Sequence, residues 1–269
     1  KAVAAYRRAK NGESKALDGL WLMLGKKLVF PKIKAKIGPS LEFLICGSAP
    51  LSDDTQNWFE MLGITVYQVY GLTETTAIVT MDKQGRIEAG RVGIAIDGCE
   101  IKVSDEGELI CRGPNIFSGY WNRPNATEAA IRDGWFHSGD QAEEDSQGNW
   151  KIIGRVGNLL VPESGHNVAP EPIEQKIMDA CDTIEQCVVV GHGKPFLTAI
   201  VTGNVEQNDV NAVMDAVNTA LPHYRRIRKF HHFSELFTIE NGLLTANQKL
   251  KRKAIYQFFE DAIEEMYAA

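Results

Sequence analysis

The segment Tyr70–Thr75 brings together side chains that could bind a nucleotide. Tyr70 offers an aromatic face for stacking, and Gly71 permits a close approach to the backbone. Thr73, at the start of an expected short helix, could bind a phosphate oxygen with help from backbone N–H groups. Glu74 could hold Mg²⁺ through its carboxylate oxygens. The same residues also fit a helix that Thr73 caps and whose dipole Glu74 complements. From these residues alone, both interpretations stay open.

A second candidate, Gly47-Ser48-Ala49-Pro50, directly follows an apolar segment. Small side chains at this place would let a flat ligand, such as an adenine ring, lie against the backbone. A tight turn with no ligand is the simpler explanation of the same residues. These four residues alone therefore do not distinguish a ligand site from a simple turn.

Both candidates follow predicted strands. Residues 41–46 and 64–70 have the apolar character of buried strands, and residues 55–62 between them form a predicted helix. Two strand-to-helix passages in succession indicate an α/β layer. Because ligands of such layers bind in the loops at the carboxyl ends of the strands, both candidates occupy a favourable position.

The rest of the chain changes character twice. From about Gly90, short apolar runs alternate with polar turns such as 104–107 and 145–149, which indicates hairpins in a small barrel or distorted sheet. After Arg155, helical and strand patterns alternate again, with strands expected over Gln186–Val190 and Leu197–Thr202 and a last helix from about Arg252 to the end. We therefore predict an α/β plus α+β fold. Its large domain would cover 1–156 (α/β over 1–88, β-rich over 89–156), and a mobile C-terminal domain would cover 157–269.

Composition limits the function classes. The 269 residues carry a net charge of −6 with a pI near 5.6, which argues against a basic nucleic-acid-binding surface. No apolar run approaches the ~20 residues that span a bilayer. Five cysteines without zinc-type spacing favour reduced thiols in a cytoplasmic protein. The chain begins at Lys1 inside a charged helical pattern, so we expect it to be a piece of a longer polypeptide.

Several motifs occur in an order typical of one family. They are Gly47–Leu51, Tyr70–Glu74, Gly107–Leu109, Gly119–Trp121, Gly134–Asp140, Gly154-Arg155, Ser164–Val168, Pro170–Glu174 and Leu244–Lys253. The ordered set resembles the C-terminal portion of the adenylate-forming (AMP-binding) superfamily, which includes acyl-CoA synthetases, luciferase-like enzymes and amino-acid-activating domains. The last three motifs are most similar to those of long-chain fatty acyl-CoA and acyl-carrier-protein synthetases.

The resemblance assigns roles to individual residues. Gly47, Ser48 and Ala49 would line one side of adenine and Tyr70 the other, and Gly71 is also expected to contribute to nucleotide binding. Thr73 would touch the α-phosphate, and Glu74 would bind the Mg²⁺ that bridges the phosphates.

Further roles follow for the later motifs. Asp140 would accept hydrogen bonds from the ribose hydroxyls, and Arg155 would add positive charge near the ribose and phosphate. Lys249 would be the catalytic lysine, which offsets negative charge during attack on the α-phosphate. Ser164 and Gly165 would border the tunnel for the pantetheine arm of coenzyme A. The neighbouring Lys251, Arg252 and Lys253 are expected to be surface charges.

Together these roles imply a ligase that uses ATP, Mg²⁺ and coenzyme A (or an acyl carrier protein) to activate a fatty acid. The resemblance implies no nucleic acid partner and leaves room for peripheral membrane contact.

Two residues depart from the pattern of the family. Gly157 stands where the family usually has a charged hinge residue, and Gln248 stands where many relatives have glycine. The family's phosphate loop is not found in this chain, so we expect the chain alone to adenylate very poorly. Activation of an aryl or amino acid for a carrier protein, and a non-catalytic AMP-binding module, remain alternative hypotheses.

Overall fold

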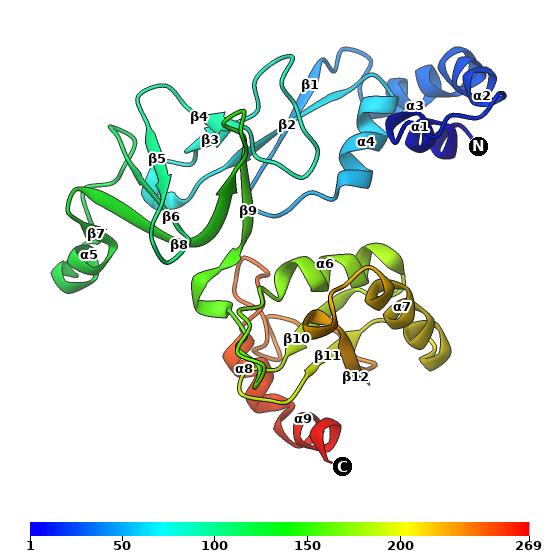
Figure 1. Ribbon diagram of the computed structural model, residues 1–269. Helices are drawn as coiled ribbons and strands as arrows, with labels where there is room; N and C mark the ends of the chain where they lie inside the picture. The colour runs from blue at the N-terminus through cyan, green and yellow to red at the C-terminus, as the bar shows by residue number, and fades with distance from the viewer. Residues whose placement is uncertain (269) are drawn as a thin grey trace. The chain divides into compact units, whose positions relative to one another are not determined.

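The computed structural model describes residues 1–268, which form two compact units (Figure 1). The first unit comprises Lys1–Ser138 and Ala142–Ile152. The second comprises Gly139–Gln141 and the chain from Ile153 onward. Three residues in the middle of one strand, β8, therefore belong to the second unit although both flanks of that strand belong to the first. The domain ranges 1–156 and 157–269 stay predictions.

The first unit contains the predicted α/β layer. Strands β1 (Phe43–Cys46) and β2 (Thr65–Tyr70) are parallel, with Phe43 opposite Thr65, and the short β3 (Thr80–Met81) and β4 (Ile94–Ala95) complete the sheet in the order β1-β2-β3-β4. Helix α4 (Asp53–Met61) connects the parallel strands. Ser52 begins this helix because its hydroxyl accepts a hydrogen bond from the Thr55 N–H at 3.2 Å.

Helices precede this sheet, as the charged pattern of residues 1–40 indicates. They are α1 (Ala2–Lys10), α2 (Asp18–Leu24), the π-helical turn η1 (Gly25–Val29) and α3 (Phe30–Ile37). Their inner side packs on α4 and β2 through a core that includes Phe30, Met61 and Ile64. This core fixes the layer that carries the first candidate residues.

The predicted β-rich section is a second sheet, most of which belongs to the same unit. Its elements are β5 (Glu100–Val103), β6 (Glu108–Arg112), α5 (Pro124–Ala130), β7 (Ile131–Arg132), β8 (Trp135–Glu144) and β9 (Trp150–Arg155). The strand order is β5-β6-β8-β7, and β9 pairs with β8. Alternate residues of β8 are buried, among them Phe136 and Asp140. A carboxylate therefore lies on the inward-facing side of this strand.

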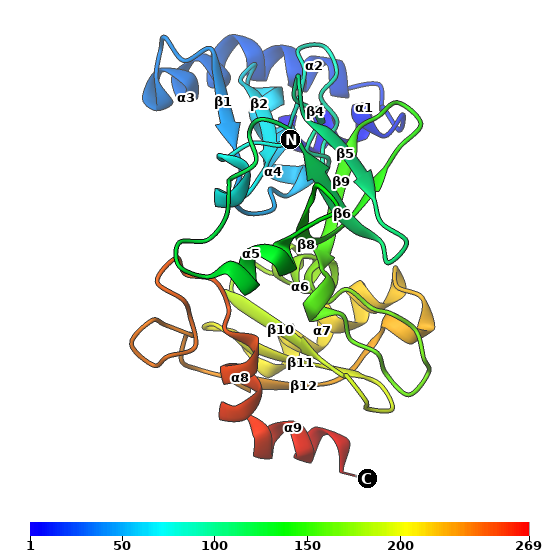
Figure 2. The same cartoon turned by 90° about the vertical axis from the view of Figure 1, so that its left-hand side faces the viewer.

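The second unit is a three-stranded sheet between two layers of helices, which Figure 2 shows from the side. Its elements are η3 (Val156–Asn158), α6 (Glu171–Ala180), β10 (Gln186–Val190), β11 (Leu197–Thr202), α7 (Gln207–Thr219), η4 (His223–Arg225), β12 (Ile227–Phe233), α8 (Arg252–Phe258) and α9 (Glu260–Tyr267). One core, under α6 and α7, includes Val189; the other, under α8 and α9, includes its neighbour Val188. Successive residues of β10 therefore point to opposite faces of the sheet.

Among the described residues, no helix is long and apolar enough to cross a membrane.

Candidate functional site

The two N-terminal candidates lie at the same edge of the first sheet. Because β1 and β2 are parallel and Cys46 pairs with Gln68, the segments that follow them begin side by side. A Cβ atom on Gly47 would come within 2.6 Å of the Val69 side chain, so only glycine fits there without a shift. Ser48 has a φ of 69°, in the left-handed region that favours glycine. Strained positions of this kind cluster at functional sites.

The turn after β2 is held by hydrogen bonds between the Thr75 side chain and the backbone of Leu72. The Thr75 hydroxyl donates to the Leu72 carbonyl at 3.0 Å and accepts from the Leu72 N–H at 2.9 Å. A Cβ on Gly71 would lie 2.1 Å from the Ala77 carbonyl oxygen. Gly71 is therefore required by the approach of the protein's own chain. The expected short helix is a single 3-10 turn, η2 (Thr73–Thr75), whose dipole is correspondingly small.

Thr73 and Glu74 are both accessible on this turn. Thr73 is exposed, and Glu74 is partly buried with its Oε1 accepting a hydrogen bond from the Tyr120 hydroxyl at 2.8 Å. Burial and the Glu74 carboxylate raise the pKa of Tyr120. Tyr120 belongs to the Gly119–Trp121 motif, but the sequence alone assigned it no role. The structure shows that its hydroxyl donates to the carboxylate that is expected to hold the metal.

Glu74 fits the expected Mg²⁺ chemistry as a single protein ligand. Among residues 1–268, no group of three or more His, Cys, Asp or Glu side chains could hold a metal ion by itself. Mg²⁺ is usually bound by one or two carboxylates together with substrate phosphates and waters. A lone, partly exposed carboxylate beside a predicted phosphate site is consistent with that mode of binding.

Asp140 and Arg155 meet in the second unit. The strands β8 and β9 pair, and the Arg155 Nε lies 2.9 Å from the Asp140 Oδ1. Asp140 is buried, with 5% of its surface exposed, whereas the Arg155 side chain is half-exposed. Gly139 has a φ of 72°, and a Cβ there would lie 3.2 Å from an Arg155 nitrogen. Because Gly139 has no side chain, the guanidinium of Arg155 has space beside Asp140.

Lys249 lies on a tight hairpin turn. Leu244 pairs with Leu250 across the turn, and the Thr245 N–H donates to the Lys249 carbonyl at 2.8 Å. The Lys249 N–H donates in return to the Thr245 hydroxyl at 3.1 Å. The Lys249 side chain is exposed, while Leu244 is buried in the core under α8. Gln248 has a φ of 58°, so the turn takes a left-handed conformation that favours glycine.

A buried ion pair anchors this turn. Arg252, the first residue of α8, donates to both oxygens of Glu174 at 2.7 and 2.6 Å, and Glu174 also accepts from the Val189 N–H at 2.8 Å. Burial opposes the charge on Arg252, but its hydrogen bonds with Glu174 raise the pKa of the guanidinium above its ordinary value. The expectation that Arg252 is a surface charge was therefore wrong. Its partner lies far away in the sequence, on α6.

The same network reaches the predicted hinge. Glu171 lies 3.5 Å from Arg252 and accepts a hydrogen bond from the Asn158 side chain at 2.6 Å. Asn158 directly follows Gly157, where a Cβ atom would meet no other atom within 4 Å. Glu171 thus links Asn158, which follows the predicted hinge, to Arg252 at the base of the turn that carries Lys249.

Ser164 and Gly165 lie on an exposed loop of the second unit. The Gly165 N–H donates to the Pro162 carbonyl at 2.9 Å, and Gly165 has a φ of 75°. The Ser164 hydroxyl lies 3.3 Å from the His166 Nδ1, and His166 stacks on Tyr224 with ring centroids 4.2 Å apart. These contacts fix the loop and leave its tip accessible.

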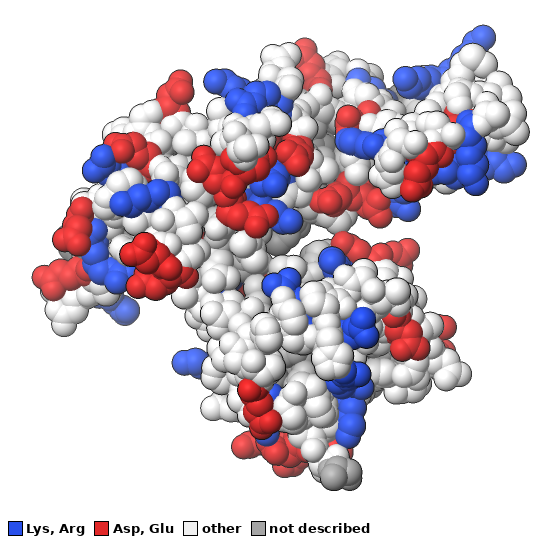
Figure 3. Space-filling view, in the orientation of Figure 1, with Lys and Arg blue, Asp and Glu red and all other residues white. Residues whose placement is uncertain are grey.

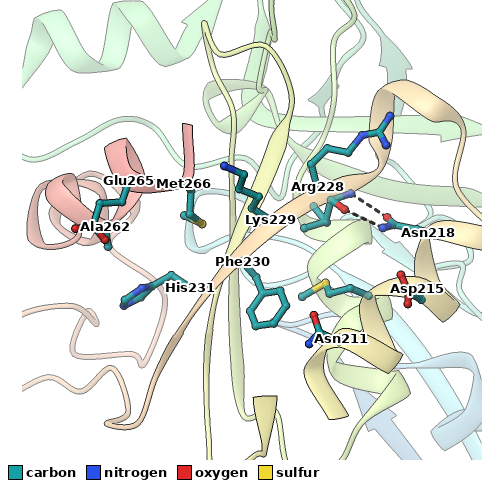
Figure 4. A pocket seen from close by; sticks show the side chains of 12 residues that line it. Asn211, Asp215, Asn218, Arg228, Lys229, Phe230, His231, Ala262, Glu265 and Met266 are labelled. Carbon is teal, nitrogen blue, oxygen red and sulfur yellow. Dashed lines mark hydrogen bonds between the residues drawn. The ribbon is translucent and has the colours of Figure 1, made fainter. Parts of the chain in front are cut away.

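A pocket of about 480 Å³ lies elsewhere in the second unit, between β12, α7 and α9 (Figure 4). Asn218 closes one end by exchanging two hydrogen bonds with the backbone of Ile227, at 2.8 and 2.9 Å. Phe230 and His231 form part of its floor. None of the predicted site residues lines this pocket, so it is separate from the candidate site.

Comparison with known proteins defines the family. Residues 16–121 match the AMP-binding enzyme family, and residues 158–269 match the AMP-binding enzyme C-terminal domain. The long-chain-fatty-acid–CoA ligase FadD15 of Mycobacterium tuberculosis is 33% identical over 99% of this chain and 50% of the relative. The human long-chain-fatty-acid–CoA ligase 6 is 31% identical over 93% of this chain and 41% of the relative. This chain therefore spans about half the length of these relatives.

Solved structures agree on the fold. An adenylation domain of a carboxylate reductase from Mycobacterium chelonae has a TM-score of 0.73 at 21% identity, covering 100% of this chain and 46% of its own. An ATP-bound RpMatB–BxBclM chimera has a TM-score of 0.69 at 26% identity, covering 93% and 54%. The predicted α/β plus α+β fold is confirmed. The chain belongs to the AMP-binding family of adenylate-forming enzymes, with fatty acid CoA ligases among its relatives.

Proposed function

We propose that this chain is part of an ATP-dependent ligase that joins a fatty acid, in particular a long-chain one, to coenzyme A. The observation that carries the proposal is the similarity to FadD15 over 99% of the chain. The accessible Lys249 on its anchored turn supports it, because a charge-stabilising group must be held in place before the reaction begins. We further propose a cytoplasmic location, which the five free cysteines favour.

In the first half-reaction, a fatty acid carboxylate oxygen attacks the α-phosphorus of ATP, an acyl–phosphate bond forms and pyrophosphate leaves. Gly47, Ser48, Ala49, Tyr70 and Gly71 form the adenine side of the site. Thr73 contacts the α-phosphate, and Glu74, which accepts a hydrogen bond from the Tyr120 hydroxyl, would hold Mg²⁺. Bound Mg²⁺ would neutralise phosphate charge. The ammonium of Lys249 offsets the charge that builds up during attack.

In the second half-reaction, the thiol of coenzyme A attacks the acyl carbonyl, a thioester forms and AMP leaves. Asp140 contacts the ribose, with Arg155 beside it, and Ser164 and Gly165 border the pantetheine arm. We propose that residues 157–269 reorient about Gly157 between the two half-reactions. Such a domain motion needs only a few residues that can absorb the change in backbone angles.

The proposal is tested by replacing the matching half of FadD15 with this chain and measuring ATP–pyrophosphate exchange with palmitate and with anthranilate. We expect exchange with palmitate, and a loss of about 10²- to 10³-fold in rate for Lys249→Ala. Lys251→Ala, two residues away and exposed, is the matched control and should leave the rate unchanged.

Three results would contradict parts of the proposal. Exchange with anthranilate but not with palmitate would refute the fatty acid assignment. Equal loss of rate in Lys249→Ala and Lys251→Ala would refute the role of Lys249. Robust exchange by the unfused chain would show that no further phosphate-binding segment is needed.

A further inference from the structure

The turn that carries Glu74 continues into strained backbone. Thr76 has a φ of 52° and Ala77 a φ of 82°, so two successive residues with side chains lie in the left-handed region. Such positions cost free energy and persist only where the surrounding structure holds them. The two hydrogen bonds between Thr75 and Leu72 close the start of the turn, before the strained pair. Contacts from another segment must therefore hold the rest of it.

Those contacts come from the segment that follows β6, residues 115–120, which we call the clasp. The side-chain amide of Asn115 donates to the carbonyl of Ile78 at 2.9 Å and to the carbonyl of Thr75 at 3.4 Å. In return, the Thr76 hydroxyl donates to the Asn115 carbonyl at 2.8 Å. Asn115 thus binds the residues on both sides of the left-handed pair, which requires a side chain with two N–H donors.

The other end of the clasp reaches Glu74 itself. The Phe117 N–H donates to the backbone carbonyl of Glu74 at 2.8 Å, and the Tyr120 hydroxyl donates to its Oε1, also at 2.8 Å. Tyr120 is fixed in turn, because its own N–H donates to the Thr127 hydroxyl at 2.9 Å and its ring meets that of Phe117 edge-on, with centroids 4.8 Å apart. Glu74 is therefore held at both its backbone and its carboxylate.

The Tyr120 hydroxyl has little to do with packing. The residue is 37% exposed, and a phenylalanine would make the same ring contact with Phe117. The hydroxyl adds one hydrogen bond, and its acceptor is a carboxylate, which makes the bond stronger than one between neutral groups. This bond fixes where the carboxylate of Glu74 points.

We propose that Asn115 and Tyr120 are positioning residues, which hold the turn and the carboxylate of Glu74 in the arrangement that receives phosphate-bound Mg²⁺. The metal role of Glu74 rests on the proposed function, whereas the fixing of its turn does not. Outer partners of a metal-binding carboxylate orient it, so their loss weakens metal binding although they never touch the metal. Every contact of the clasp joins residues of the first unit, so none depends on what else covers the protein.

The first test measures hydrogen exchange of the purified chain by mass spectrometry. The N–H groups of Thr75, Ala77 and Val79 are protected by hydrogen bonds within the turn, and local opening sets their exchange rates. Asn115→Ala should speed exchange over residues 75–79 about tenfold and leave β10 and β11 unchanged, because two carbonyls lose their donor.

Two further variants make this test specific. Asn115→Asp keeps the size of the side chain but cannot donate, so it should speed exchange as much as Asn115→Ala does. Asn208→Ala, at an exposed position of α7, is the matched control and should change nothing over residues 75–79. Unchanged exchange over 75–79 in both Asn115 variants would overturn the clasp, as would parent-like exchange in Asn115→Asp alone.

The second test measures ATP–pyrophosphate exchange against free Mg²⁺ in the fusion with FadD15. Tyr120→Phe keeps the ring and loses the hydroxyl, so the Mg²⁺ concentration for half-maximal rate should rise about tenfold while the maximal rate stays close to that of the parent. Tyr267→Phe, which removes a hydroxyl that donates to the Phe196 carbonyl at 3.0 Å, is the matched control and should leave the Mg²⁺ dependence unchanged.

The two tests separate the positioning role from the proposed function. An inactive parent fusion would refute the proposed function and with it the metal role of Glu74, while hydrogen exchange still decides whether the clasp holds the turn. An active parent fusion whose Mg²⁺ dependence is the same in Tyr120→Phe, or shifts equally in Tyr267→Phe, would overturn the positioning role of Tyr120 alone.

Discussion

Asp82 should make the protein less stable as the pH rises. This residue is 5% exposed, and its Oδ2 accepts a hydrogen bond from the Gln68 N–H at 2.7 Å. Its other oxygen, Oδ1, is buried with no hydrogen-bond partner among the described residues. Burial raises the pKa of the Asp82 carboxyl from 3.8 to about 6, and the Gln68 N–H only partly opposes this. The charged form is therefore disfavoured in the folded protein.

The size of the effect follows from linkage. The folded protein holds the Asp82 proton more tightly than the unfolded chain, so the contribution to stability is complete below pH 3.8 and is lost as the pH rises through about 6. Each pKa unit is 1.36 kcal/mol, and the shift thus amounts to about 2 to 3 kcal/mol of unfolding free energy.

The assay compares urea unfolding of the parent chain and the Asp82→Asn variant between pH 3.5 and 8, followed by tryptophan fluorescence. The variant removes the titration, so the stability of the parent minus that of the variant should fall by about 2 to 3 kcal/mol across this range. Asp105→Asn, at an exposed turn, is the matched control and should give a constant difference. A pH-independent difference for Asp82→Asn would refute the reasoning.

Three further outcomes are expected. Gln248→Gly should raise the unfolding free energy by about 0.5 to 1 kcal/mol in thermal unfolding, because glycine relieves the left-handed backbone; no gain would argue against that strain. Arg252→Ala should cost about 3 to 5 kcal/mol by leaving Glu174 buried and unpaired, whereas Lys253→Ala should cost under about 0.5, and similar losses would contradict the buried pair. A thiol reagent should label the native chain slowly at Cys99, Cys111 and Cys187, where burial raises the pKa (for Cys111 to about 12), and rapid labelling there would contradict the packing.

The sequence predicted strands correctly where the residues of the strand alone carry the signal. The continuous apolar runs Gln186–Val190 and Leu197–Thr202 are strands with the predicted ends, because both of their faces are covered by helices. Strand β12 was not predicted: its Arg-Lys-Phe-His-His sequence lacks apolar alternation because it lies at the edge of the sheet. The single helix expected from Arg252 onward is instead two helices, which meet at Phe259.

The site residues stay a prediction, and the sequence could group only those candidates that are contiguous, not contacts between residues distant in sequence. Tyr70, Gly71 and Glu74 could be grouped as candidates because they lie within one short segment at the end of β2. Tyr120 was not linked to Glu74, since the partners are separated by 46 positions and only the fold joins them. Arg252 was misjudged for the same reason. Likewise, a net charge summed over the chain concealed its basic start, because an average does not record where charges lie. Residues 1–40 carry ten Lys or Arg against two Asp or Glu, and Figure 3 shows a run of blue over the helices α1 to α3.

The shared strand β8 has a consequence for dissecting the protein. Gly139–Gln141 belong to the second unit although they are preceded and followed by residues of the first. A single cut near Ile153 would therefore separate Arg155 from Asp140, whose side chains lie 2.9 Å apart in the intact chain. Proteolysis or truncation at that point would yield a C-terminal piece that lacks the strand segment carrying Asp140, and an N-terminal piece that retains this segment but loses the guanidinium beside it. The two units are thus distinct in packing yet interwoven in sequence, and neither can be prepared complete by dividing the gene at one position.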